Sequence, residues 1–258
     1  MDHSTTQAQR DWPPPVEVLN AEGPSPVVLL CEHAANFIPS EYGRLGVDPS
    51  ELQRHIAWDI GAAAVARALS RQLDAPALLG TCSRLLIDLN RPLHVPSSIV
   101  TRSESTEVPG NVALTLAERQ RRVSRIFAPY HDAVESTLAE RSKAGRRNVI
   151  VSIHSFTPTF HGVARKWHAG ILFEKAAAFA QVTMDRLRAD DPGLLVGANV
   201  PYAASADEDY GLFVHGENIG NPAILIEIRQ DLLTLEDHAQ SWAERLARTL
   251  AIDVALEA

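Results

Sequence analysis

Residues 148–155 read NVIVSIHS, and this stretch is the strongest indication of the fold class. The run from Val149 to Ile153 is β-branched except at Ser152, a pattern typical of a strand that is covered on both faces. Such strands belong to parallel sheets flanked by helices, and ligands bind these sheets at the carboxyl ends of the strands. The run stops at His154 and Ser155, so these polar residues are expected at a ligand-binding edge.

Similar apolar runs alternate with helical patterns along the rest of the chain. Further strands are predicted at residues 26–31, 76–79, 84–89, 170–173 and 223–228, and helices at residues 48–73, 115–143, 174–188 and 234–250. Asp48 and Thr115 are the expected N-caps, and Pro129 should kink or break its helix near Phe127. The alternation predicts an α/β fold over residues 1–258, a single domain with a mostly parallel or mixed sheet and helices on both faces. Residues 1–15 are expected to be flexible.

Composition limits the classes of partner. The formal net charge of the 258 residues is −8 and no long basic run occurs, so a nucleic-acid partner is not expected. No stretch of 18 uninterrupted apolar residues occurs, and the polar start of the chain has no apolar signal core, so we expect a cytoplasmic protein without a membrane partner. Cys31 and Cys82 are expected to be buried, reduced thiols. The oligomeric state is not indicated.

Two histidines follow predicted buried strands. His33 and His154 could therefore hold a metal jointly, and a catalytic zinc needs a third protein ligand and an open position. Asp59 is the best candidate, because it is the one acid in an apolar helical pattern at residues 55–66. The alternative is an ion pair between Asp59 and His55, one helical turn away. Glu32 should point to the opposite face of its strand from His33.

A carboxylate also lies inside the last predicted strand. Glu227 stands in the sequence ILIEIR, residues 224–229, where an unpaired acid would be costly. It could act as general base for a metal-activated water, or it could pair with Arg229 on the same strand face. His215, in the loop before this strand, is grouped with Glu227 as a catalytic candidate, because that loop could close over the site.

Arginines and an amide follow the strand predicted at residues 84–89. Arg84, Asn90 and Arg91 frame Asp88, and Arg binds carboxylates in a bidentate manner, so these three residues are expected to bind a substrate carboxylate. For Arg84 the alternative is a structural pair with Asp88.

Several segments together resemble a known family. They are CEHAANFIP (31–39), HIAWDIG (55–61), SRLLIDLNRP (83–92), HGE (215–217) and IEIR (226–229). In this order they resemble the N-formylglutamate amidohydrolase family over residues 26 to about 233, and they are more distantly similar to zinc carboxypeptidases and aspartoacylases. The resemblance implies a hydrolase-like α/β fold and metal-assisted amide hydrolysis, with His33 and His154 as ligands and Glu227 as general base. It also implies that Asn90 and Arg91 bind the substrate carboxylate.

The resemblance does not supply the third ligand. The carboxypeptidase pattern has a Glu three positions after the first His, where this chain has Asn36. The amidohydrolase pattern has an acid at the position of Asp59, which supports that residue as a ligand.

The sequence therefore predicts a hydrolase that uses zinc or another divalent metal. Its substrate is expected to be a small N-acyl amino acid or a related amide that bears a carboxylate, with the acyl group left open. A non-catalytic metal- or metabolite-binding module is the alternative. A cysteine hydrolase using Cys31 and His33 is a third, disfavoured interpretation.

Overall fold

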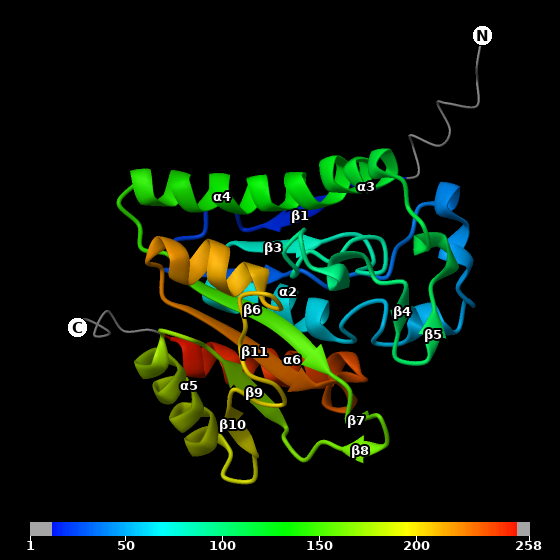
Figure 1. Ribbon diagram of the computed structural model, residues 1–258. Coiled ribbons are helices and arrows are strands. Elements are labelled where there is room, and N and C mark those ends of the chain that lie inside the picture. The colour runs from blue at the N-terminus through cyan, green and yellow to red at the C-terminus, as the bar shows by residue number, and fades with distance from the viewer. Residues whose placement is uncertain (1–11, 252–258) are drawn as a thin grey trace.

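The computed structural model describes residues 12–251 and is built on a seven-stranded mixed sheet (Figure 1). The strands in chain order are β1 (Val16–Leu19), β2 (Val27–Cys31), β3 (Ala77–Gly80), β6 (Val149–Phe156), β9 (Ala169–Leu172), β10 (Val196–Ala198) and β11 (Ala223–Arg229). Their order in the sheet is β1-β3-β2-β6-β11-β9-β10. The four strands β3, β2, β6 and β11 are parallel, whereas β1 and β9 join this block antiparallel. The predicted α/β class is confirmed.

Helices cover both faces of the sheet, as predicted. They are α2 (Ala62–Leu73), α3 (Leu116–Arg122), α4 (Ala128–Lys143), α5 (Ala177–Asp190) and α6 (Glu236–Leu250). Side chains of α2, α5 and α6 share one apolar core with alternate strand residues such as Val151 and Ile153. Side chains of α4 share a second core with the opposite strand face, for example Ile150. Figure 1 shows α4 along one side of the sheet, with α5 and α6 on the other.

The helix predicted at residues 115–143 begins where expected. The Thr115 hydroxyl oxygen accepts a hydrogen bond from the Glu118 backbone N–H, at 3.1 Å. Near Phe127, where a kink or a break was expected, the structure has a π-helical segment, Val123–Phe127, that joins α3 to α4. Pro129 directly follows this segment, so the wider π turn lies where a residue without an N–H interrupts the α-helical hydrogen bonds.

The strand predicted at residues 84–89 is wrong. This segment forms turns, and the Asp88 backbone N–H donates to the Ser98 carbonyl instead of to a neighbouring strand. Leu85, Leu86 and Ile87 are nevertheless fully buried in the second core. A short buried apolar run therefore does not by itself identify a strand.

The helix predicted at residues 48–73 is wrong in its first half. A single 3-10 turn, Glu51–Gln53, is followed by further turns, and α2 begins only at Ala62. Gly61 interrupts the helical pattern with φ of 83°, a left-handed conformation that glycine adopts readily. Asp59 therefore lies in the turn that leads into α2.

Two small hairpins complete the structure at one end of the sheet. They are β4 (Arg102–Ser103) with β5 (Thr106–Glu107), and β7 (Thr159–Phe160) with β8 (Val163–Ala164). In Figure 1 both lie on the side to which the arrowhead of β6 points. The remaining 3-10 or π turns are Ser40–Gly46, Pro96–Ile99, Pro109–Asn111, Leu212–Gly216, Glu217–Ile219 and Gln230–Leu233.

Three other predictions can be compared with the structure. Cys31 and Cys82 are buried free thiols, as expected. Within residues 12–251, no helix is both long and apolar enough to cross a membrane. Of the stretch 1–15 that was expected to be flexible, residues 1–11 lie outside the described residues.

Candidate metal centre and active-site cavity

The carboxyl ends of three adjacent parallel strands bring the main candidates together. His33 follows β2, His154 lies near the end of β6, and Glu227 stands beside His154 in the register of β11. All three side chains are almost fully buried. The sheet order β2-β6-β11 therefore places both histidines and the predicted base at one edge.

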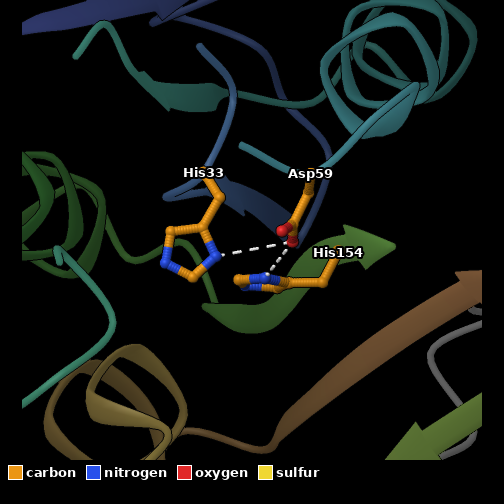
Figure 2. Close-up of side chains that lie close together, drawn as sticks. All are labelled: His33, Asp59 and His154. Atoms are coloured by element: carbon orange, nitrogen blue, oxygen red, sulfur yellow. Dashed lines mark hydrogen bonds and ion pairs between the residues drawn. The ribbon is translucent and has the colours of Figure 1, made fainter. Parts of the chain in front are cut away.

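Asp59 joins the two histidines from the turn before α2. Its backbone N–H donates to the His33 carbonyl at 2.9 Å, which fixes the turn against the end of β2. Asp59 Oδ2 lies 2.8 Å from His154 Nδ1 and 3.4 Å from His33 Nδ1 (Figure 2). One ligand atom from each of these three residues lies within 4.8 Å of the others. The structure thus brings together the three residues predicted to bind a metal.

The alternative partner for Asp59 is not found. His55 Nε2 lies 3.3 Å from Glu104 Oε1, so the predicted Asp59–His55 ion pair is replaced by an ion pair with the β4–β5 hairpin. The reason is the missing helix, because positions 55 and 59 do not lie one helical turn apart.

Carboxylates also hold the outer nitrogen of each histidine. His33 Nε2 lies 2.6 Å from Asp88 Oδ1, and His154 Nε2 lies 3.0 Å from Glu32 Oε2. An ionised carboxylate only accepts hydrogen bonds, so both Nε2 atoms donate to their carboxylates. His154 Nδ1 likewise donates to Asp59, and although burial lowers the pKa of His154, its hydrogen bonds to Asp59 and Glu32 raise that pKa well above its usual value. Carboxylate–histidine pairs of this kind orient the ring and increase its basicity as a metal ligand.

The expectation that Glu32 points away from His33 is wrong. Glu32 is the first residue beyond β2, where the alternation of an extended strand no longer determines the direction of a side chain. Its side chain reaches the end of β6 and contacts His154.

The ionisation of the three buried carboxylates differs. Burial alone would raise the pKa of Asp59, but His33 and His154 hold this pKa well below its usual value. For Glu32 the hydrogen bond to His154 likewise outweighs burial and lowers the pKa. Burial raises the pKa of Glu227 to about 7, with His154 opposing this rise and Asp59 adding to it. Glu227 can therefore exchange a proton near neutral pH, whereas Asp59 stays ionised.

The cluster opens into a cavity of about 430 Å³, a size suited to a small-molecule ligand. The residues predicted to bind substrate, Arg84, Asn90 and Arg91, line this cavity. Arg84 Nη2 lies 2.7 Å from Asp88 Oδ2, so the structural pair considered for Arg84 is present. Arg91 Nη2 lies 2.7 Å from the carboxylate of Glu208. Both guanidinium groups therefore already have a carboxylate partner.

Glu227 faces the cavity and makes neither a hydrogen bond nor an ion pair with Arg229. The Tyr202 hydroxyl donates to Glu227 Oε1 at 2.5 Å, and Glu227 Oε2 is buried with no hydrogen-bond partner among residues 12–251. Arg229 pairs instead with Asp231, at 2.8 Å. The Glu227–Arg229 pair considered from the sequence is therefore absent.

His215 does not reach the cavity. It lies in the π-helical turn Leu212–Gly216, is 1% exposed, and its Nε2 lies 2.8 Å from His131 Nδ1. His131 Nε2 in turn lies 3.0 Å from the Leu89 carbonyl oxygen, which it can reach only as a donor. Burial lowers the pKa of His131 to about 3 and that of His215 to about 4, so both rings are neutral. His215 is therefore a buried partner of His131 and is not among the residues that line the cavity.

The residues that the sequence did not indicate include Glu32 as a partner of His154, and Phe160, Arg165 and Tyr202 on the cavity wall. Phe160 and Arg165 belong to the β7–β8 region, and Tyr202 lies in the long loop 200–222. That loop could be recognised as functional from its length, but no local pattern indicated which of its residues would face the site.

Comparison with known proteins identifies the family. The model of the N-formylglutamate amidohydrolase family matches residues 25–234. A gene product of Agrobacterium tumefaciens, with a solved crystal structure, is 39% identical over 92% of this chain and 94% of that chain, with a TM-score of 0.86. N-formylglutamate amidohydrolase from Ralstonia eutropha JMP134 is 20% identical over 92% of this chain and 96% of that chain, with a TM-score of 0.69.

Other comparisons are weaker. A metallo-carboxypeptidase from Burkholderia cenocepacia is 10% identical over 96% of this chain and 67% of that chain, with a TM-score of 0.38. No curated protein matches the chain. The matched family model spans most of the chain, including every strand of the sheet except β1, so the chain belongs to the N-formylglutamate amidohydrolase family.

Proposed function

We propose that this protein is a metal-dependent amidohydrolase that cleaves small N-acyl amino acids, N-formyl derivatives included, or related amides. The observation that carries the proposal is the convergence of His33, Asp59 and His154 within 4.8 Å. The donor set of two imidazoles and one carboxylate is that of several catalytic zinc sites. His33 Nδ1 is buried and has no hydrogen-bond partner among residues 12–251, so this nitrogen is available to bind a metal.

The chemistry divides between the metal and Glu227. Zinc or another divalent ion held by these three residues would polarise the amide carbonyl and bring the pKa of a water ligand to about 7. Glu227 accepts the proton of the attacking water and passes it to the leaving amine. Burial raises the pKa of Glu227, which strengthens this carboxylate as a proton acceptor.

The rest of the cavity binds the substrate. We propose that Arg84, Asn90 and Arg91 contact its polar groups, since all three line the cavity. The cytoplasmic location and the absence of a nucleic-acid partner are predictions from the sequence alone.

A non-catalytic binding module is less well supported. Such a module would need no base, and Glu227 could then be neutralised by Arg229. Glu227 instead lines the cavity, and its Oε2 has no hydrogen-bond partner in the described part of the chain. A polar atom left buried and unpaired costs stability, which favours a functional role for it.

The proposal can be tested on the purified protein. Elemental analysis should find one divalent metal per chain, and a screen of N-formyl, N-acetyl and other N-acyl amino acids should reveal hydrolysis that a chelator abolishes. His33→Ala and His154→Ala should each remove the metal. Full metal content in both variants, or hydrolysis that is insensitive to the chelator, would refute the proposal.

A further inference from the structure

The β7–β8 hairpin region places a cationic side chain, Arg165, at the cavity. The proposed reaction assigns no role to this residue. The hairpin follows β6 directly, and the Arg165 backbone N–H closes it by donating to the Pro158 carbonyl at 2.8 Å. Phe160 on β7 and Arg165 just after β8 both line the cavity. The hairpin therefore adds an aromatic and a cationic group to the same space that contains the metal centre.

Three aromatic rings surround the Arg165 guanidinium. Its central carbon lies 4.5 Å from the ring centroid of Phe160 and 5.8 Å from those of Phe156 and Tyr202. These distances are typical of cation–π contacts, which attract the charge and restrict the motion of the side chain. Tyr202 also donates to Glu227, so one side chain, Tyr202, contacts both Arg165 and the proposed base.

Arg165 differs from the other arginines of the cavity in its partners. Arg84 lies 2.7 Å from Asp88, Arg91 lies 2.7 Å from Glu208, and Arg102 lies 3.4 Å from Glu107. Within residues 12–251, the guanidinium of Arg165 has no carboxylate within 4.0 Å and makes no hydrogen bond. Its five N–H donors are therefore available to a ligand, in the fork geometry that matches a carboxylate.

We propose that Arg165 is the residue that binds the carboxylate of the substrate. This assigns the carboxylate to Arg165 rather than to Arg84 and Arg91, whose charges are already compensated by neighbouring acids. The aromatic rings hold the guanidinium in place, so little side-chain entropy is lost when the carboxylate binds. The inference rests on the proposed function in one respect, namely that the substrate is an N-acyl amino acid with a carboxylate.

The test measures binding, so that it does not depend on turnover. The probes are N-formyl-L-methionine and its carboxamide, titrated calorimetrically into the full-length Glu227→Gln protein. In that protein, Arg165→Ala should weaken binding of the acid on the order of 10- to 100-fold and leave binding of the carboxamide unchanged. Arg165→Lys should restore part of the loss, because it keeps the charge but not the fork.

The matched control is Lys166→Ala. It removes the same charge from the neighbouring position, which does not line the cavity, and should leave both affinities unchanged. Unaltered binding of the acid to Arg165→Ala would overturn the inference, and so would equal affinity of the acid and the carboxamide for the parent protein. If no N-acyl amino acid is hydrolysed but the calorimetric difference is found, the proposed function fails and the role of Arg165 stands.

Discussion

At the scale of single residues, Asp59 contacts both histidines of the proposed metal centre. Its Oδ2 lies within 3.4 Å of both His33 Nδ1 and His154 Nδ1. Asp59→Asn keeps the size of the side chain but removes its charge, so metal affinity should fall steeply in equilibrium titrations. His55→Ala is the control, because His55 also lines the cavity but contacts Glu104, and it should retain the metal. Full retention of metal by Asp59→Asn would show that Asp59 is not a ligand.

Substitution of Glu227 should affect turnover without affecting the binding of metal or substrate. Glu227→Gln keeps the shape of the side chain and can still accept the hydrogen bond from Tyr202, but it cannot take the proton of water. Turnover should fall by roughly 10²- to 10⁴-fold, whereas metal content and substrate affinity should stay close to wild type. Steady-state kinetics combined with elemental analysis makes this comparison. Hydrolysis at the wild-type rate would exclude Glu227 as the base.

At the scale of elements, the start of α2 depends on Gly61. Its φ is 83°, and a Cβ built there would lie 2.4 Å from Leu233 Cβ. Gly61→Ala should therefore lower the free energy of unfolding by at least about 2 kcal/mol, from backbone strain and overpacking together. Gly145 has φ of 73° but no atom within 4 Å of its Cβ position, so Gly145→Ala should cost only about 1 kcal/mol. Urea unfolding measures both, and equal losses would mean that the contact with Leu233 is unimportant.

The elements also show what the sequence could predict. His33, His154 and Glu227 could be placed at one edge because each lies at the end of, or within, an apolar run, and parallel strands end together. Asp59 was found for a sound reason, the cost of burying an acid, but in the wrong element. The apolar run around Ile87 was mistaken for a strand, because burial in an irregular loop leaves the same pattern as burial in a sheet.

The loop residues of the cavity could not be predicted from apolar runs and strand ends in the sequence. Tyr202 and Arg165 are 37 positions apart in the chain and come from an irregular loop and a short hairpin. Their contact at 5.8 Å depends on how β9, β10 and the loop after them fold back over the sheet edge. Neither periodicity nor capping encodes such a path, so only the tertiary structure places these residues.

At the scale of the whole molecule, stability should depend on pH through two buried histidines, His131 and His215, and one buried carboxylate, Glu227. His131 and His215 have pKa values lowered to about 3 and about 4, below the value of about 6.5 in an unfolded chain. Between about pH 6.5 and 4 the unfolded state binds more protons at these sites, so their contribution to stability is lost as the pH falls. Glu227 acts in the opposite direction between about pH 7 and 4.3, because its pKa is raised by burial.

Because these effects oppose each other, the prediction concerns a difference between variants. His131→Gln can still donate to the Leu89 carbonyl but carries no titrating ring. We expect it to be less stable than wild type at pH 7 and to lose less stability on acidification to pH 5, by urea unfolding at each pH. His94→Gln is the control, because the side chain of His94 is 75% exposed and its removal should leave the pH dependence unchanged. If His131→Gln and wild type lose the same stability between pH 7 and 5, the neutral His131–His215 pair is not a source of acid sensitivity.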